Sequence, residues 1–340
     1  GSMMLYSLLH LAGYNISLED LKQFRQWGSI TPGHPEYGVT PGVDTTTGPL
    51  GQGFANGVGM AIAESHLAAR FNRQNFNLFD HYVYGIVTDG DLMEGVASEA
   101  ASLAGHLKLG KIIYCYDDNH VSIDGSTDLT FTEDRGKRFE AYGWQVLHIS
   151  DGNNVEQIDA AISTAKTDPR PSLIICPTHI GYGLPSRQDT AKAHGEPPGD
   201  EELNGAKVKL GWPVEPRFLV PEDTLAIYRE AGNKGHNLAE NWNSMLRSYL
   251  QHFPEEGIDL DRRLKGALPE NWEFALPKFE ADQKGMATRV ASGQALNTAA
   301  EILPELVGGS ADLTPSNNTK LKNSPDYSPD ERIGRYFHFG

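Results

Sequence analysis

The chain has 340 residues, of which 39% are hydrophobic, and a formal net charge of −16 at pH 7. This length and composition predict a globular protein of more than one domain and exclude a disordered tail. The acidic balance argues against a nucleic-acid backbone as the main partner, but not against a phosphorylated ligand, because backbone N–H groups, local cations or a metal bind phosphates in acidic proteins too.

The first part of the chain predicts helices followed by a long loop. Apolar residues recur at helical spacing from Ser2 to Leu11, with Gly13 as the expected stop, and residues 18–27 continue the pattern. Seven glycines and four prolines then fall between Gly28 and Gly53. A loop of this kind inside a compact domain is uncommon unless it has a function.

Strand-like and helix-like segments alternate over the next part of the chain. The expected helices are 54–71, 91–110, 138–143 and 153–167, and the expected strands are 82–87, 111–119, 144–149 and 172–180. This alternation predicts an α/β fold, with an open, mostly parallel sheet and helices on both faces.

The alternation of strand-like and helix-like segments ends near residue 205. We expect a linker-like stretch at 209–223, a polar helix at 224–253, a connector at 255–284, a helix at 287–303 and a short strand at 306–309. A second α/β unit is expected to begin there. The predicted domain organisation is a first domain over 1–255, a linker over 256–284 and the start of a second domain over 285–340.

Several function classes receive no support. No run of about 18 apolar residues predicts a membrane span, and no signal peptide is visible. Cys115 and Cys176 lie in strand-like apolar runs, which favours buried thiols in a reduced cytoplasmic chain. Glycines 51, 53 and 57 do not have the spacing of a dinucleotide-binding fingerprint, so a nicotinamide cofactor is not expected.

Two polar residues follow successive predicted strands. Asp89 follows one strand and Asn119 ends the next, with a helix between them, so both should reach the carboxyl edge of a parallel sheet, where such folds bind ligands. Carboxylate and amide oxygens suit a hard cation such as Mg²⁺ or Ca²⁺ that also takes phosphate oxygens. The alternatives are structural, because Asp is a common helix N-cap and Asn a common turn residue.

Longer strings resemble a known family. Asp89–Gly90 and the later Asn119 resemble the thiamine-diphosphate motif GDG…N, with Thr88 in place of its first glycine. Strings that are similar to transketolases run over nearly the whole chain: TPGHPE (31–36), TTTGPLGQG (45–53), DGDLMEG (89–95), SLAGHLKLGK (102–111), YDDNHVSIDG (116–125), RFEAYGW (138–144), HGEPPG (194–199) and GGSADLTPSN (308–317). The resemblance implies a thiamine-diphosphate-binding fold, with a diphosphate-binding domain followed by the beginning of a pyrimidine-binding domain.

The resemblance also implies a cofactor site. Asp89, Asn119 and the backbone carbonyl of Val121 would hold the divalent ion, Mg²⁺ or Ca²⁺, that bridges the diphosphate of thiamine diphosphate. The residues implied to contact the cofactor itself are Gly48, Pro49, Leu50, Gly90, Glu94, Asn119, His194 and Asp312. Glu94 and Asp312 are implied to belong to the network between two subunits.

For the substrate, the resemblance implies His34 and His194 as catalytic and substrate-binding histidines. Arg289 and Ser316 would grip the sugar phosphate, and an arginine suits a phosphate through its bidentate fork. The histidines at 10, 66 and 81 do not lie in strings that match the family, and we assign them no functional role. Asp91 has no implied role beyond favouring a helix N-terminus.

The implied activity is that of a transketolase in the pentose phosphate pathway, a cytoplasmic homodimer that acts on sugar phosphates and has no nucleic-acid or membrane partner. It would transfer a two-carbon glycolaldehyde unit from a ketose phosphate, such as xylulose 5-phosphate, to an aldose phosphate, such as ribose 5-phosphate. Two alternatives stay open: a related ketol transferase of the dihydroxyacetone synthase type, and a catalytically incomplete fragment that only binds cofactor or partner. The family's SNGH string and the VREF string with its cofactor-activating glutamate are absent from these 340 residues.

Overall fold

The computed structural model describes residues 1–281 and 283–340, and the chain forms two compact units. The first unit comprises Gly1–Ala61 and Tyr82–Glu240, and the second comprises Ile62–His81 and Asn241–Gly340. Helices α3 (Gln52–Phe71) and α9 (Glu222–His252) each contribute residues to both units. These units are not the predicted domains, whose boundaries stay a prediction; Asp282, within the predicted linker, lies outside the described residues.

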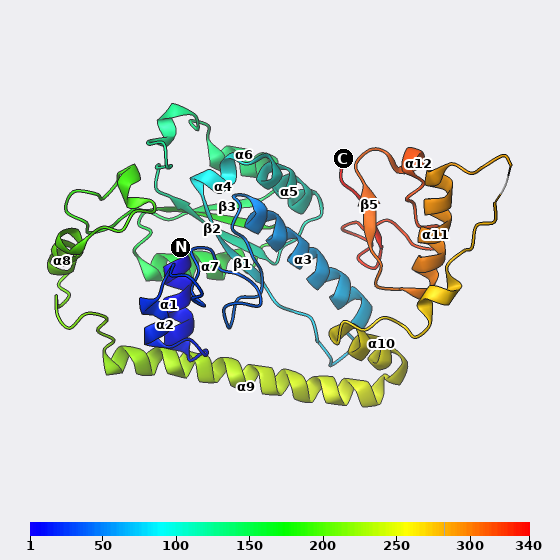
Figure 1. Cartoon of the computed structure of the whole chain (residues 1–340), viewed down its shortest axis with the longest axis horizontal. Coiled ribbons are helices and arrows are strands. Elements are labelled where there is room, and N and C mark those ends of the chain that lie inside the picture. Colours follow the sequence, from blue (N-terminus) through cyan, green and yellow to red (C-terminus); the bar gives the residue numbers. More distant parts are fainter. Residues whose placement is uncertain (282) are drawn as a thin grey trace. The chain divides into compact units, whose positions relative to one another are not determined.

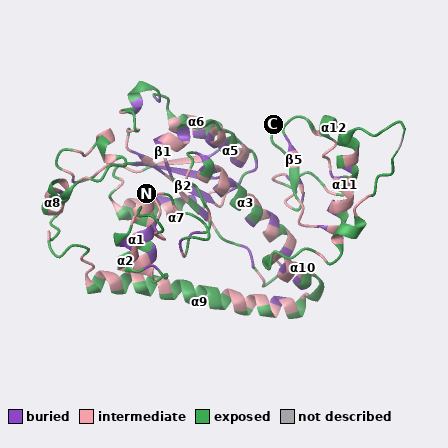
Figure 2. Ribbon diagram, viewed as in Figure 1, coloured by how far each residue is buried: buried purple, intermediate pink, exposed green. Residues whose placement is uncertain are grey.

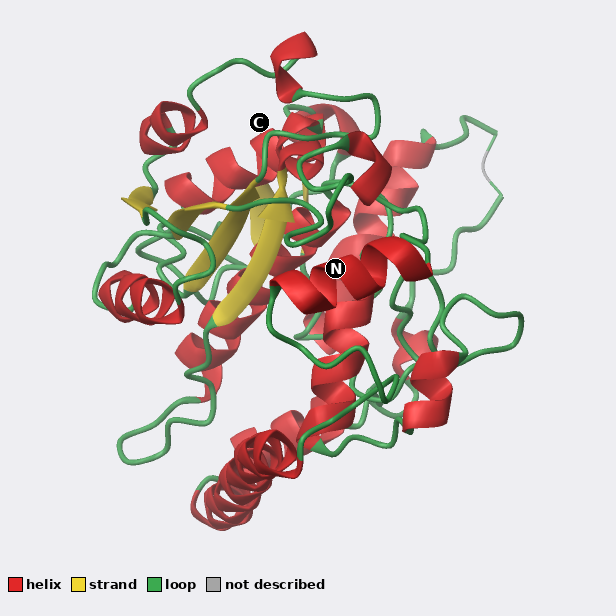
Figure 3. Ribbon diagram, turned by 90° about the vertical axis from the view of Figure 1, so that its left-hand side faces the viewer, coloured by secondary structure: helices red, strands yellow, loops and turns green. Residues whose placement is uncertain are grey.

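A four-stranded parallel sheet forms the centre of the first unit, which confirms the predicted fold class. Its strands run in the spatial order β1-β2-β4-β3. Figures 1 and 3 show the sheet with helices packed around it. The strands are β1 (Val83–Thr88), β2 (Ile112–Asp118), β3 (Gln145–His148) and β4 (Ser172–Pro177). The apolar, β-branched and aromatic runs of β2 and β4 are typical of strands that are buried on both faces, whereas Tyr84 and Ile86 of β1 are exposed.

Helices cover both faces of this sheet, because successive side chains of a strand point to opposite sides. On one face, Ile113 packs in a buried cluster with Ala161 and Ala165 of α7 (Val155–Ala165). On the other face, the Tyr114 ring lies 4.7 Å from that of Phe54 in α3 and 5.9 Å from that of Trp144 (centroid to centroid). Helix α6 (Arg135–Ala141) joins this aromatic cluster through Phe139.

The helix predicted over 91–110 is wrong in its extent, because two helices replace it: α4 (Asp89–Met93) and α5 (Gly95–His106). The chain is extended at Glu94, with φ −73° and ψ 137°. Gly95, a poor helix former, follows this break, and the Glu94 side chain packs against the backbone of Gly51 there. The break separates a short helix at the sheet edge from the longer helix that runs back along the sheet.

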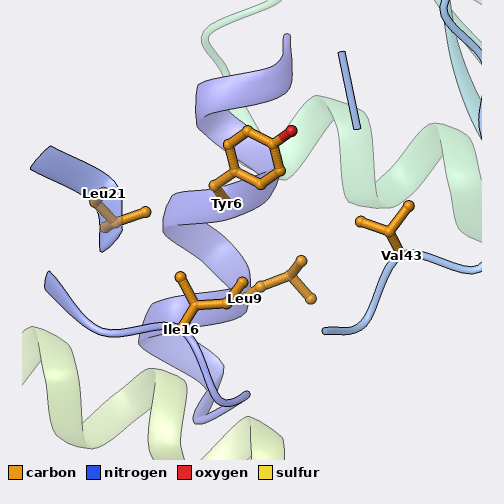
Figure 4. Packing of buried hydrophobic residues seen from close by; sticks show 5 residues of the cluster. All are labelled: Tyr6, Leu9, Ile16, Leu21 and Val43. Carbon is orange, nitrogen blue, oxygen red and sulfur yellow. The ribbon is translucent and has the colours of Figure 1, made fainter. Parts of the chain in front are cut away.

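The N-terminal helices pack on the Gly/Pro-rich loop in the first unit. Helix α1 (Ser2–Ala12) ends at Gly13 in the left-handed conformation, as predicted, and α2 (Leu18–Lys22) begins at the N-cap Ser17. Figure 4 shows their buried apolar cluster, made of Tyr6, Leu9, Ile16, Leu21 and Val43. Val43 belongs to the loop, so this cluster helps to hold the loop in place.

The remaining helices and strands follow in chain order. They are α8 (Asp200–Lys209), α9, α10 (Pro254–Leu264), α11 (Thr288–Ile302), β5 (Gly308–Ser310), α12 (Thr314–Asn317) and β6 (Tyr336–His338), with short 3₁₀ turns at Thr127–Leu129, Ala191–Ala193 and Trp272–Ala275. The predicted short strand is confirmed as β5, which pairs in parallel with β6. The predicted connector contains α10, which begins with Pro254 at a position where proline favours helix initiation. Most of α9 is exposed or half-buried (Figure 2).

Candidate functional site

The ends of β1 and β2 lie side by side at the carboxyl edge of the sheet. Thr88 pairs with Asp117 in the parallel register, so Asp89 and Asp118 follow at the same level. Asp89 is also the first residue of α4. The local fold therefore places a carboxylate both at a sheet edge and at a helix N-terminus, as the sequence predicts.

Asp89 is almost completely buried, with 1% of its surface exposed. Its Oδ1 accepts a hydrogen bond from the Tyr116 hydroxyl, and its Oδ2 accepts one from the backbone N–H of His120 at 3.1 Å. Burial raises the pKa of the Asp89 carboxyl above its usual value, although the hydrogen bond from Tyr116 opposes this shift. A nearby cation would favour the ionised form, so this carboxyl is suited to a positively charged ligand.

The turn after β2 brings the other predicted ligands next to Asp89. Because His120, between Asn119 and Val121, donates its N–H to Asp89, the three predicted metal ligands belong to one small region. The Oδ1 atom of Asn119 accepts a hydrogen bond from the N–H of Val121 at 3.0 Å, and its Nδ2 donates to Asp117 at 3.2 Å. These contacts fix which way the Asn119 amide points.

The donor set fits a hard divalent ion. One carboxylate, one amide oxygen and one backbone carbonyl are the kinds of ligand that Mg²⁺ and Ca²⁺ take, together with phosphate oxygens. Within residues 1–281 and 283–340, no group of three or more His, Cys, Asp or Glu residues is arranged to hold a metal ion. A site with a single carboxylate does not form such a group, and the assignment of these ligands stays a prediction.

The loop with the predicted cofactor residues lies against the start of α4. A side-chain carbon placed on Gly90 would come within 3.3 Å of the Leu50 side chain. The N–H of Gly51 donates to Asp91 Oδ1 at 3.0 Å, and a Cβ on Gly51 would come within 2.8 Å of Glu94. Gly51 also has a φ of +74°, so a larger residue would be strained there as well as crowded.

Asp91, for which the sequence indicates no specific role, links this loop to the sheet. Its Oδ2 accepts hydrogen bonds from both the N–H and the hydroxyl of Thr88, each at 3.0 Å, while its Oδ1 accepts the bond from Gly51. Thr88 itself has an extended backbone with φ −120°, which any residue adopts. A threonine is therefore accommodated where the family motif has its first glycine.

The two predicted histidines lie on exposed loop segments. His34 packs near the backbone of Gly48, since a Cβ placed on Gly48 would lie 3.4 Å from the imidazole carbon Cγ. His194 follows the 3₁₀ turn Ala191–Ala193 and is exposed. Arg25 contacts the residue next to each histidine. Its Nη1 donates to the carbonyl of Gly195, and its Nε lies 3.0 Å from the position of a Cβ on Gly33; the hydrogen bond to Gly195 measures 3.3 Å.

Three predicted site residues belong to the second unit and are described within it. Arg289 lies at the start of α11, Asp312 lies between β5 and α12 with a φ of +61°, and Ser316 lies in α12; all three are exposed. Helix α11 packs beside the end of α12, because a Cβ on Gly293 would approach the Asn318 carbonyl to 2.7 Å. A cavity of about 290 Å³ in this unit is lined by Asn297, Ala300, Glu301, Pro304, Leu321, Asn323 and Arg335, and by none of these three.

Sequence reasoning missed the groups that surround Asp89. Tyr116 is fully buried, and Asp118, 9% exposed, forms an ion pair with Arg135 at 2.9 Å. Tyr116 and Asp118 belong to the string YDDN, whose polar residues at the end of an apolar strand were a usable signal. Arg135 lies in a polar segment at the start of α6, and nothing in that segment singles it out.

The family follows from comparison with known proteins. The family model described as "Transketolase, thiamine diphosphate binding domain" matches residues 1–269. The chain belongs to the transketolase family. A transketolase of Geobacillus stearothermophilus is 52% identical over all of this chain and 51% of its own length, and the chloroplastic transketolase-1 of Arabidopsis thaliana is 49% identical over 99% of this chain and 46% of its own length.

Solved transketolase structures agree with this family membership. The transketolase of Pichia stipitis in complex with sedoheptulose 7-phosphate matches 99% of this chain and 51% of its own, with a TM-score of 0.95 and 46% identity. The transketolase of Leishmania mexicana also has a TM-score of 0.95, with 47% identity over 99% of this chain and 50% of its own. The chain thus spans about half the length of the transketolases it matches. None of its described helices has the length and apolar character needed to cross a membrane.

Proposed function

We propose that this protein is a transketolase, which reversibly transfers a two-carbon glycolaldehyde unit from a ketose phosphate, such as xylulose 5-phosphate, to an aldose phosphate, such as ribose 5-phosphate. The observation that carries the proposal is the hydrogen bond from the His120 N–H to Asp89, which joins the predicted metal ligands at the carboxyl edge of a transketolase-family domain. Thiamine diphosphate would supply the carbon nucleophile of this reaction.

Asp89, Asn119 and the carbonyl of Val121 would hold the divalent ion, Mg²⁺ or Ca²⁺. Gly90 would let the backbone approach the diphosphate beside it, at the N-terminus of α4. Gly48, Pro49 and Leu50 would line one side of the cofactor, and Leu50 already packs against Gly90. The contact between Gly51 and Glu94 keeps this loop close to α4.

His34 and His194 would position the sugar and move protons at its hydroxyl and carbonyl oxygens. Their exposure suits groups that contact a substrate arriving from solvent. Arg289 and Ser316 would bind the substrate phosphate, and the exposed guanidinium of Arg289 can form a bidentate pair with it. Pichia stipitis transketolase structures with bound sugar phosphates support this substrate class.

The active form that we propose is a homodimer with the cofactor between subunits, in which Glu94 and Asp312 contribute to the interface network. Both residues are exposed in the single chain. The location that we propose is the cytoplasm, within the pentose phosphate pathway, and the free thiols of Cys115 and Cys176 are compatible with a reducing compartment.

Calorimetric titration tests the proposal. Thiamine diphosphate should bind the purified protein saturably in the presence of Mg²⁺ and bind weakly when the metal is chelated. Its Mg²⁺-dependent binding to Asp89→Ala should be weaker by more than about 100-fold. Unchanged cofactor affinity in Asp89→Ala would contradict the assignment of Asp89 as a metal ligand. A coupled assay with ribose 5-phosphate against formaldehyde as acceptor then separates a transketolase from a dihydroxyacetone synthase, and cofactor binding without transfer to either acceptor would identify a catalytically incomplete chain.

A further inference from the structure

The Asp89 carboxylate is held by a side chain that the cofactor assignment does not use. Tyr116, from β2, has none of its surface exposed, and its hydroxyl donates to Asp89 Oδ1. A tyrosine hydroxyl carries its proton at neutral pH. A protonated hydroxyl has one hydrogen to donate, and this hydrogen is directed at Asp89.

Arg135 determines the direction of that hydroxyl. Its Nε donates to the Tyr116 hydroxyl oxygen at 3.1 Å, and its Nη2 donates to Asp118 Oδ1 at 2.9 Å. Its guanidinium lies 5.8 Å from the centroid of the Tyr116 ring and 5.4 Å from that of Phe131. Its Nη1 donates to the carbonyl of Glu133 at 2.9 Å, so the guanidinium is held by three hydrogen bonds and two rings, and 14% of the side chain is exposed.

Because the Tyr116 oxygen accepts from Arg135, its own hydrogen cannot point that way and is left for Asp89. The other Asp89 oxygen accepts from the His120 N–H at 3.1 Å, so both carboxylate oxygens are fixed. Each retains a lone pair for a further ligand. Arg135 also places one partly buried positive charge near two buried carboxylates, those of Asp89 and Asp118.

We propose that Arg135 and Tyr116 are positioning residues for the divalent ion: Arg135 fixes the Tyr116 hydroxyl, which in turn orients the Asp89 carboxylate toward the metal. This inference rests on the proposed function, because it takes Asp89 as a metal ligand. Partners in the layer behind the ligands are known to orient metal-binding side chains, and their removal weakens metal binding by about 10- to 100-fold.

The ion pair with Asp118 alone does not explain the arrangement. That pair uses Nη2, whereas the contact with Tyr116 uses Nε, and both are made at hydrogen-bonding distance. A residue that served only to neutralise Asp118 would not need the second contact. A positioning role therefore predicts that the effects of Arg135 and Tyr116 on metal affinity depend on each other.

A double-mutant cycle tests this dependence. The apparent affinity for Mg²⁺ is measured at saturating thiamine diphosphate, by calorimetry and by tryptophan fluorescence, for the wild type, Tyr116→Phe, Arg135→Met and the double variant. Each single variant should bind Mg²⁺ about 10- to 100-fold more weakly. The double variant should be no weaker than the weaker single variant, because Arg135 acts through the hydroxyl that Tyr116→Phe has already removed.

Two further variants serve as a charge control and as a replacement for Arg135→Met. Lys137→Met removes a positive charge from the same helix, but the Lys137 side chain is 81% exposed and its ammonium pairs with Asp134, so Mg²⁺ affinity should stay unchanged. If Arg135→Met does not fold, Arg135→Lys takes its place in the test, because a lysine retains a cation that can reach Asp118. It lacks the fixed guanidinium fork, so it should still bind Mg²⁺ more weakly than the wild type.

The outcomes separate this inference from the proposed function. Multiplying effects in the double variant, or wild-type Mg²⁺ affinity in Tyr116→Phe while Asp89→Ala loses binding, would overturn the positioning role and leave the metal site intact. Wild-type affinity in both Asp89→Ala and Tyr116→Phe would overturn the metal site itself, and with it this inference.

Discussion

Asp89 in the first unit and Asp259 in the second are carboxylates with opposite surroundings. Asp259 accepts hydrogen bonds from Arg70, Arg262 and Arg263, each at 2.9 Å. Among the described residues, no lysine or arginine forms an ion pair with Asp89, and Arg135 reaches it only through the Tyr116 hydroxyl.

The pKa values of the two carboxyls differ accordingly. Burial raises the pKa of Asp89. Burial alone would also raise the pKa of Asp259, but the hydrogen bonds and charges of the surrounding arginines outweigh it and lower that pKa to about 2. A carboxylate that arginines pair with directly is structural, whereas one that is buried without a direct lysine or arginine partner is suited to a cation from outside.

The largest effect is expected at Asp89. Asp89→Ala should weaken Mg²⁺-dependent binding of thiamine diphosphate by more than about 100-fold, since even groups behind a metal ligand contribute about 10- to 100-fold. Calorimetry on the folded variant measures this. Asp128→Ala, an exposed acid in the loop after β2, is the control and should bind like the wild type. If both variants lose the same affinity, the loss of negative charge near the site explains the effect, and Asp89 is not a metal ligand.

His194 should behave differently from Asp89 and Asp259, because it is exposed and lies in a loop. His194→Ala should lower kcat by about 100-fold, in the range of a lost proton-transfer group, and should weaken cofactor binding less than that, with the Tm nearly unchanged. Steady-state kinetics and calorimetry measure these quantities, with the exposed His81→Ala as the control. A loss of cofactor affinity as large as the loss of kcat would show that His194 acts mainly by binding the cofactor.

Asp259 should affect folding and not cofactor binding. Asp259→Asn should lower the free energy of unfolding at pH 7 by about 2 to 3 kcal/mol, the amount that corresponds to a carboxyl pKa depressed by nearly two units. Urea unfolding measures this. Asp261→Asn, on the same helix, removes an exposed pair with Lys265 and should cost less than about 1 kcal/mol. Equal losses in the two variants would mean that the arginine cluster adds no special stability.

The pH dependence of Asp259 follows from its lowered pKa. Its contribution is present above the unfolded pKa of about 3.9 and is lost as the pH falls toward the folded value of about 2. The difference in unfolding free energy between the wild type and Asp259→Asn should therefore shrink between about pH 5 and about pH 2. A difference that stays constant over this range would show that a process other than this titration destabilises the variant.

The smallest effect is expected at Arg25, an exposed residue that contacts both histidine-bearing segments. Arg25→Ala should lower kcat/KM by roughly two- to tenfold, the range of one ordinary hydrogen bond, without affecting cofactor affinity. Lys22→Ala, another exposed cation nearby in sequence, is the control. Wild-type kcat/KM in Arg25→Ala would show that the segments hold their positions without this link.

The sequence by itself determined the parallel α/β sheet, the family and the two strand ends that carry Asp89 and Asn119. Alternating apolar segments and family strings are local signals, and β1 and β2 end where these signals indicate. Element ends were not all predicted: the single helix predicted over 91–110 is broken at Glu94, which lies against Gly51 of a loop that is distant in the sequence.

Only the tertiary structure decided which groups surround Asp89. The sequence assigns no role to Tyr116 or Arg135, and it gives Asp91 none beyond favouring a helix N-terminus. The fold brings Arg135 to Tyr116 across 19 positions of the chain and Asp91 to Gly51 across 40. Such contacts depend on strand register and on how α6 and the Gly/Pro-rich loop pack, and no local pattern encodes them.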